Sequence, residues 1–287
     1  VATLVVKWTP AAAERKCLGS VEICGKTLPQ VALFCSHNAY SSAEDGFIAP
    51  NHYGTLNNSL HAGVRGLMLD VWLEDGMAQL CHGSCRLGRM SLIRGLRTVA
   101  EFLQANPNEV IVIVFEDYLP DHSYLAADMR ESGLEELVFT PTNRTAEGGL
   151  LVWPTVGEMI DAGTRVVVMS DVDVPSLAYV MELFGESFEN HWAATNKEDL
   201  KCGQHPSAPR GTPHPERLYI LNTFLTAPIG SPTLAETINY DSFLSGFTER
   251  CRDEMNGHMP NLVCLDFWSI GDGKAVVDRL NAEAATG

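Results

Sequence analysis

Side chains that can transfer protons recur at the ends of short apolar runs in this sequence. His37 comes two residues after the run 31–35, and His82 directly follows the extended segment 77–81. One imidazole can remove a hydroxyl proton while the other protonates a leaving oxygen, which is what cleavage of a phosphodiester requires. The sequence therefore predicts acid/base catalysis by two histidines.

Oxygen donors lie at the ends of the same and other runs. Asn38 directly follows the first histidine, and Asp70 and Glu116 end two further runs. Amide and carboxylate oxygens suit a hard cation that would neutralise phosphate charge, so we expect Ca²⁺, with Mg²⁺ as the second candidate. Zinc at the Cys-His-Gly-Ser-Cys segment 81–85 is the rival interpretation. A closed zinc site needs further Cys or His at suitable spacing, and the sequence shows none.

The elements that must position these residues are predicted by hydrophobic periodicity. Several strand-like runs are apolar throughout, as parallel strands covered on both faces are. Their alternation with amphipathic segments indicates an α/β fold, for which a TIM (β/α)8 barrel is the natural single-domain form, with its chemistry at the carboxyl ends of the strands. Strands are expected at 31–35, 66–71, 110–115, 165–169, 218–222 and 262–267, and helices at 91–105, 124–132, 155–162, 240–255 and 273–283.

Length and charge limit the organisation and the partners. The 287 residues fit an N-terminal extension, 1–29, followed by one barrel domain, 30–287. A formal net charge of −16 repels phosphate polyanions, so nucleic acid is not expected as a partner. The same charge disfavours general adhesion to anionic membranes and leaves peripheral contact through a local basic or aromatic spot. No apolar stretch approaches the roughly 20 residues of a transmembrane helix.

Eight cysteines bear on the cellular compartment. Two pairs lie close together in polar segments, and such short loops suit disulfides in an oxidising compartment, with reduced buried thiols as the alternative. Sequons at 57–59 and 143–145 also fit secretion, so we expect a secreted glycoprotein. The expected short-loop pairs are Cys17 with Cys24 and Cys81 with Cys85; Cys202 could pair with Cys251 across the proline-rich loop 196–216, and Cys35 and Cys264 are expected as buried thiols.

The candidate residues belong to longer motifs. These motifs are SHNAY at 36–40, GVRGLMLD at 63–70, LCH at 80–82 and IVFEDY at 113–118. In order and spacing they resemble the X domain of phosphatidylinositol-specific phospholipase C, and most closely the secreted single-domain phospholipase C-like phosphodiesterases of plants and fungi. The likeness continues at 153–156, 221–224 and 260–267, so it covers nearly all of the chain from about residue 30.

The resemblance implies a fold, a reaction and roles for several residues. The fold is a distorted TIM barrel, in which the inositol 2-hydroxyl attacks phosphorus to give a cyclic inositol phosphate and free diacylglycerol. By position, His37 is the first catalytic histidine and His82 is the general acid. Asp266 is expected to orient a histidine or contact substrate. For Arg65, phosphate binding and a structural ion pair are equally weighted interpretations.

The resemblance also implies a metal site that is incomplete here. Calcium-dependent members of the family use an Asn after the first His, a Glu-x-Asp pair and a later Glu. Asn38, Asp70 and Glu116 match, whereas Met68 replaces the Glu of the pair. We therefore expect weaker calcium binding unless another carboxylate or water substitutes. The metal-independent bacterial pattern fits less well, because Trp72 occupies the place of its arginine.

Three functions follow from the sequence. The leading one is a secreted phosphodiesterase acting on phosphatidylinositol, a glycosylated relative or another phosphodiester. The second is a glycerophosphodiesterase-like or sphingomyelinase D-like barrel, which also uses two histidines and a metal. The third is a binding or defence protein that kept the barrel and lost a competent metal site, which Met68 and the acidic surface favour.

Overall fold

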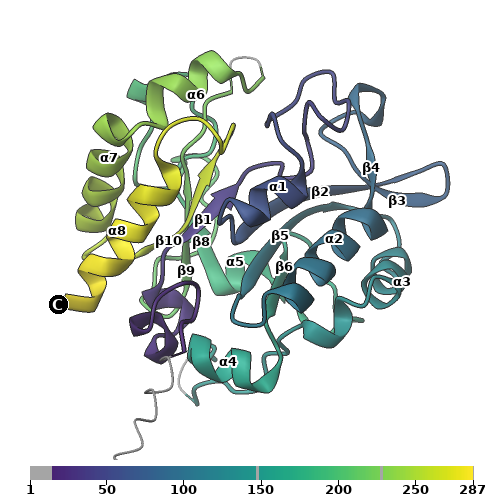
Figure 1. Cartoon of the computed structure of the whole chain (residues 1–287), viewed down its shortest axis with the longest axis horizontal. Helices are drawn as coiled ribbons and strands as arrows, with labels where there is room; N and C mark the ends of the chain where they lie inside the picture. Colours follow the sequence, from purple (N-terminus) through teal and green to yellow (C-terminus); the bar gives the residue numbers. More distant parts are fainter. Residues whose placement is uncertain (1–14, 147–148, 227–228, 287) are drawn as a thin grey trace, which may run out of the picture.

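A curled sheet of eight parallel strands forms the centre of the molecule (Figure 1). The computed structural model describes residues 15–286, except 147–148 and 227–228. The strands are β1 (Leu33–Ser36), β2 (Gly66–Glu74), β5 (Ile111–Tyr118), β6 (Val166–Ser170), β7 (Val180–Glu182), β8 (Ser187–Glu189), β9 (Leu218–Asn222) and β10 (Pro260–Leu265). They are ordered β7-β6-β5-β2-β1-β10-β9-β8, and each neighbouring pair is parallel.

The predicted distorted TIM barrel is confirmed, and the structure shows where it is distorted. In the described part of the chain, no hydrogen-bonded ladder joins the two end strands, β7 and β8. The one-turn helix α5 (Leu183–Glu186) connects them instead. The barrel is therefore open between β7 and β8. No α-helix is assigned in the described residues between β6 and β7 or between β8 and β9, so strand and helix do not alternate strictly there.

Longer helices pack outside the sheet. Figure 1 shows α6, α7 and α8 grouped near β9 and β10, with α2 and α3 on the other side of the sheet. In α2, the residues at 92, 96, 99 and 103 are all buried, as the predicted stripe requires. The helices are α1 (Leu56–His61), α2 (Leu92–Ala105), α3 (Ser123–Glu131), α4 (Val156–Ala162), α6 (Pro232–Ile238), α7 (Asp241–Glu254) and α8 (Gly273–Thr286).

The core has two layers that share the strands. Along β5, Ile111 and Ile113 pack in the layer that includes α2 and α3, whereas Val112 and Val114 pack in the cluster between the strands of the barrel. Alternate residues of a strand point to opposite faces. Burial on both faces explains why the strand reads as a continuous apolar run.

A hairpin extends the sheet beyond β2. The strand β3 (Met77–Leu80) pairs antiparallel with the end of β2, and the short strand β4 (Met90–Ser91) pairs with β3. The sequence predicted an extended segment here but not its antiparallel pairing. This hairpin carries the loop in which His82 lies.

The structure confirms the disulfide assignments. Cys17 bonds to Cys24, Cys81 to Cys85, and Cys202 to Cys251. Because both thiols of the segment 81–85 are oxidised, the rival zinc site is excluded. The two buried free thiols are Cys35 and Cys264.

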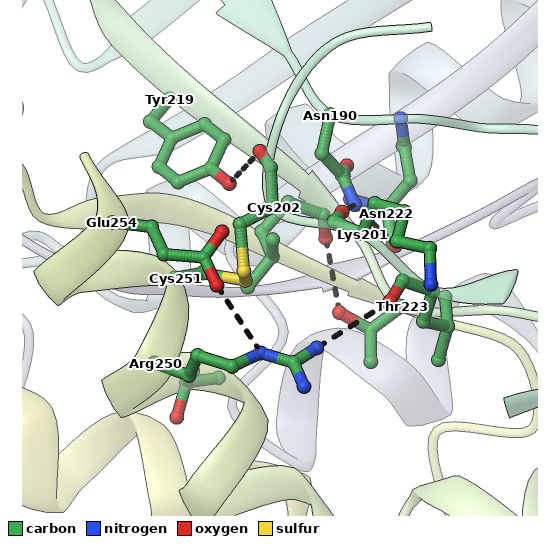
Figure 2. The surroundings of a disulfide bond; sticks show 12 residues. Asn190, Lys201, Cys202, Tyr219, Asn222, Thr223, Arg250, Cys251 and Glu254 are labelled. Atoms are coloured by element: carbon green, nitrogen blue, oxygen red, sulfur yellow. Dashed lines mark hydrogen bonds and ion pairs between the residues drawn. A yellow bond between two sulfur atoms is a disulfide. The ribbon is translucent and has the colours of Figure 1, made fainter. Parts of the chain in front are cut away.

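The disulfide between Cys202 and Cys251 holds a long connection against the barrel (Figure 2). This connection runs from the end of β8 to the start of β9 and is joined by the disulfide to α7. Tyr219 donates its hydroxyl hydrogen to the Cys202 carbonyl at 2.7 Å, and the Asn190 amide donates to the Lys201 carbonyl at 2.9 Å. The bridge thus fixes a segment that local periodicity leaves undefined.

The N-terminal extension packs on the barrel as far as it is described. The Val156 N–H at the start of α4 donates to the Lys26 carbonyl at 2.8 Å, and Lys26 Nζ donates to the Ala284 carbonyl at 2.7 Å. The predicted division at residue 29 stays a prediction, and residues 1–14 lie outside the described part. None of the described helices has the length and apolar character needed to cross a membrane.

Candidate active site

The first histidine forms a dyad with a carboxylate from the neighbouring strand. His37 follows β1 and Asp266 follows β10, and their Nδ1 and Oδ1 atoms are 2.9 Å apart. Asn51 donates to the same carboxylate oxygen at 2.9 Å, and the His37 ring stacks on Phe224 with centroids 3.7 Å apart. An ionised Asp266 holds the imidazole hydrogen on Nδ1, which leaves the lone pair of Nε2 as a base.

The second histidine is paired with a carboxylate in the same way. His82 Nδ1 lies 3.2 Å from Asp70 Oδ2. This hydrogen bond raises the pKa of His82 above its ordinary value, because a carboxylate stabilises the imidazolium. His82 is therefore suited to donate a proton, whereas His37 is suited to accept one.

The two imidazoles face each other. Their ring centroids are 6.4 Å apart and their planes are inclined at 82°. The Asn38 amide nitrogen lies between them, 3.3 Å from His37 Nε2 and 3.0 Å from His82 Nδ1. Tyr40 donates its hydroxyl hydrogen to Asn38 Oδ1 at 3.3 Å. The predicted histidines, Asp266 and Asn38 are thus brought together at one end of the barrel.

Two predicted carboxylates lie side by side on adjacent strands. Asp70 on β2 and Glu116 on β5 are register partners, and both line the cavity beside the histidines. Burial, and then the negative charge of Asp70, raise the pKa of Glu116. Two neighbouring carboxylates that repel each other in this way would be stabilised by a cation between them. Asp171, which follows β6 and also lines the cavity, has its pKa raised mainly by burial.

The donor set for a cation is small. Asp70, Glu116 and the oxygen of Asn38 are present, and Met68 lines the cavity where the resemblance expected a carboxylate. Among the described residues, no group of three or more His, Cys, Asp or Glu side chains has an arrangement that could hold a metal ion. Two carboxylates and one amide oxygen are therefore present, one carboxylate fewer than the resemblance implies, and binding of a hard cation here stays a prediction.

A cavity of about 370 Å³ joins these groups to residues that the sequence analysis did not select. Applying the strand-end rule to every strand would have found Glu189 and Asn222, which end β8 and β9. The three-residue strand β8 was not predicted, so the sequence did not indicate that Glu189 lies at the end of a strand. The further lining residues include Asp171, Glu189, Trp192, Arg210, Asn222 and Phe224.

A buried carboxylate in this cavity holds an arginine. Arg210 Nη1 lies 3.1 Å from Glu189 Oε1, and the Asn222 amide donates to Glu189 Oε2 at 3.0 Å. The guanidinium also lies over the Trp192 ring, 4.8 Å from its centroid. Arg210 is the only lysine or arginine among the described residues that line the cavity. It comes from the proline-rich loop, where no local signal indicates a site.

Arg65 is not among the described residues that line the cavity, so its assignment to phosphate binding stays a prediction. It precedes the first residue of β2, whereas Asp70 lies further along the strand toward its carboxyl end. Arg65 Nε is 2.7 Å from Glu109 Oε2, and Nη1 donates to the carbonyls of Leu60 and Val64, each at 2.7 Å. The alternative interpretation, a structural ion pair, is the one that the structure supports.

A third histidine, His52, is buried behind the site. Its Nε2 lies 2.7 Å from the His37 carbonyl oxygen and 2.8 Å from Ser36 Oγ, whereas Nδ1 has no hydrogen-bond partner in the described part. Burial lowers the pKa of His52 from 6.5 to about 4. The ring is therefore neutral at pH 7, with its hydrogen on Nε2, and supports the backbone that carries His37.

Protonation of His52 should make stability depend on pH. Between about pH 6.5 and pH 4 the unfolded chain binds a proton that the folded chain does not, so stability falls as the pH is lowered, by up to roughly 3 kcal/mol. We expect His52→Gln to remove this part of the slope in urea unfolding curves. Other groups titrate in both proteins, so the difference between variant and wild type isolates His52. The exposed His61 provides the control, since His61→Gln should retain the wild-type slope.

Comparison with protein families gives a match over most of the chain. The family model described as PI-PLC X 1 matches residues 23–281. A PI-PLC X domain-containing protein of Arabidopsis thaliana is 27% identical over 88% of this chain and 62% of its own length. Two proteins of Arthroderma benhamiae are each 26% identical. One is an uncharacterized secreted protein, and its match covers 94% of this chain and 64% of its own length. The other is PI-PLC X domain-containing protein 1, and its match covers 95% of this chain and 91% of its own length.

Solved structures show the same fold at low sequence identity. The phosphatidylinositol-specific phospholipase C from Listeria monocytogenes has a TM-score of 0.60 at 16% identity, covering 90% of this chain and 94% of that one. A variant of the Staphylococcus aureus phosphatidylinositol-specific phospholipase C has a TM-score of 0.57 at 14% identity, with coverages of 85% and 87%. At these identities the likeness establishes the fold. The chain spans less than two thirds of the length of the Arabidopsis relative and of the secreted Arthroderma relative.

Proposed function

The chain belongs to the PI-PLC X domain family, and from this membership we propose that it is a phosphodiesterase that cleaves phosphatidylinositol, or a glycosylated relative of it, as a phospholipase C does. One observation carries the proposal. His37 with Asp266 and His82 with Asp70 form two dyads that face each other at one cavity. This arrangement supplies a base and an acid on either side of a bound phosphorus.

The attack step uses His37. Its Nε2 accepts the proton of the inositol 2-hydroxyl as that oxygen forms a bond to phosphorus. Asp266 stabilises the positive charge that develops on the imidazole, and the stacked Phe224 limits rotation of the ring. The base is therefore oriented before substrate binds.

The departure step uses His82. As the bond from phosphorus to the diacylglycerol oxygen breaks, the imidazolium donates its proton to that oxygen. The products are a cyclic inositol phosphate and diacylglycerol. Asp70 favours the protonated form of His82 in the starting state, since its hydrogen bond raises the pKa of the ring.

Arg210 is the residue we propose for contact with the phosphate. Its link to Glu189 uses one of its nitrogens, so further guanidinium donors are available to an anion in the cavity. We expect Arg210→Ala to lower kcat/KM by roughly 10- to 100-fold, the cost of a lost charged hydrogen bond, mainly through a higher KM. Arg65→Ala is the matched control. It should lower the free energy of unfolding by roughly 1–3 kcal/mol and leave kcat/KM per folded molecule unchanged. The opposite pattern would return phosphate binding to Arg65.

Asn38, Asp70 and Glu116 are the residues we propose to hold Ca²⁺, with Mg²⁺ as the second candidate. A bound cation would neutralise negative charge on the phosphate. Met68→Glu should tighten Ca²⁺ binding by roughly tenfold, because carboxylate count sets affinity for this ion. Calorimetric titration of wild type, Met68→Glu and the neutral control Met68→Gln measures this without any substrate. Equal affinities in all three proteins would place the ion elsewhere.

The surroundings proposed for this activity are extracellular. Three disulfides suit an oxidising compartment, and one relative is named a secreted protein. The proposed partner is a phospholipid head group, with peripheral contact at the membrane surface. Asn57 and Asn143 of the two sequons are exposed, and their glycosylation stays a prediction.

The proposed function is tested by product analysis. Wild-type protein is incubated with vesicles of phosphatidylinositol, with Ca²⁺ or with a chelator, and ³¹P NMR follows the products. We expect a cyclic inositol phosphate, formed faster with Ca²⁺. Choline or a cyclic lipid phosphate from lysophospholipid or sphingomyelin substrates would instead support the sphingomyelinase D-like alternative. No product from any phosphodiester would favour the third function, a barrel kept for binding, which Met68 also favours.

A further inference from the structure

The two proposed catalytic histidines are supported to different degrees. His37 lies directly after a central strand, stacks on Phe224 and has a side chain that is 16% exposed. His82 lies in the loop 81–89 between β3 and β4, and its side chain is 49% exposed. A half-exposed ring on a loop loses its orientation easily unless the loop itself is constrained.

A disulfide closes the part of the loop that contains His82. Cys81, which is fully buried, bonds to Cys85, so the ring of five residues has His82 as its second member. The Cys81 N–H donates to the Asp70 carbonyl at 3.3 Å, and within the ring the Ser84 N–H donates to the His82 carbonyl at 2.6 Å. One end of the ring is thus attached to the residue whose carboxylate holds the His82 imidazole.

The other end of the ring is tied to the segment that follows β1. The Leu87 N–H donates to the Ser84 carbonyl at 3.0 Å, and the Ile48 N–H donates to the Leu87 carbonyl at 2.7 Å. The segment after β1 also carries His37 and Asn38. The closed ring is therefore tied at one end to β2 and at the other to the segment that follows β1.

We propose that the Cys81–Cys85 disulfide is a positioning device that keeps His82 directed at the leaving oxygen. This inference rests on the proposed function. Without the bridge, residues 82–85 regain backbone freedom, and a smaller fraction of molecules hold the imidazole against Asp70. Proton donation to the leaving oxygen should weaken, whereas the attack step at His37, which belongs to a different element, should be unaffected.

The test separates these two steps by the leaving group. Phosphatidylinositol releases an alkoxide that needs a proton, whereas myo-inositol 1-(4-nitrophenyl phosphate) releases a nitrophenolate that does not. We expect the double variant Cys81→Ala/Cys85→Ala to lose at least roughly tenfold in turnover of phosphatidylinositol and less than about twofold with the nitrophenyl substrate. His82→Ala should show the same pattern in larger measure.

The matched control removes the other short-loop disulfide. Cys17→Ala/Cys24→Ala should stay within about twofold of wild type on both substrates, since that bridge lies in the N-terminal extension, away from the cavity. Equal losses on both substrates for the Cys81/Cys85 double variant, or no loss, would overturn the proposal. An inactive wild-type protein would instead overturn the proposed function.

A second measurement applies if the double variant does not fold. Native protein is treated with a limiting amount of dithiothreitol, which is oxidised to its cyclic disulfide as a protein disulfide becomes two thiols. Alkylation and peptide mass spectrometry identify molecules in which only the bridge at 81–85 is open. The same selective loss with phosphatidylinositol is expected of those molecules, and unchanged turnover would overturn the proposal.

Discussion

Replacing His37 by alanine should lower the turnover of phosphatidylinositol by roughly 10²- to 10⁴-fold, the usual contribution of a positioned general base. The substitution removes Nε2 of His37, the nitrogen that we propose accepts the proton of the 2-hydroxyl. Among the described residues that line the cavity, the other histidine is His82, to which we assign the acid role. Because the nitrophenyl substrate needs the same attack step, it should lose a similar factor. Loss on both substrates distinguishes His37 from His82.

His61→Ala is the control for this substitution. His61 is exposed on α1, where its Nδ1 lies 2.9 Å from the Asn57 carbonyl oxygen. It is not among the described residues that line the cavity. Initial rates with both substrates, at equal concentrations of folded protein, should match wild type for this variant. A His37→Ala enzyme that kept wild-type turnover would remove the two-histidine mechanism.

Asp266→Asn should have the second-largest effect, a loss of roughly 10²- to 10⁴-fold in kcat. The change preserves shape and removes one negative charge. An amide nitrogen facing Nδ1 would favour the tautomer with the hydrogen on Nε2, and that tautomer cannot accept the hydroxyl proton. The structural reason is the 2.9 Å contact between His37 Nδ1 and Asp266 Oδ1.

The readout for Asp266 must separate catalysis from folding. Single-turnover rates report the chemical step, and urea unfolding reports stability, since Asp266 also accepts from Asn51. Asn51→Ala is the matched control, because it removes the second hydrogen bond to the same oxygen and leaves the carboxylate in place. It should cost far less in kcat than Asp266→Asn. Equal losses for the two variants would assign Asp266 a structural role.

Much of the site follows from the sequence because it depends on local rules. His37 follows β1, and Asp70 and Glu116 directly follow apolar residues of β2 and β5; parallel pairing then places them near one another toward one end of the barrel. The short-loop disulfides follow from the closeness of their cysteines along the chain. The fold class follows from the alternation of apolar runs with amphipathic helices.

Only the tertiary structure decided which distant groups meet. His37 and Asp266 are 229 residues apart and come together because the first and last strands are neighbours. Arg65 is ion-paired with Glu109 before the start of β2, whereas Arg210, which no local sequence signal indicated, lines the cavity from a loop and pairs with Glu189. Periodicity records the burial of each element, whereas such contacts depend on strand order and packing of the whole sheet.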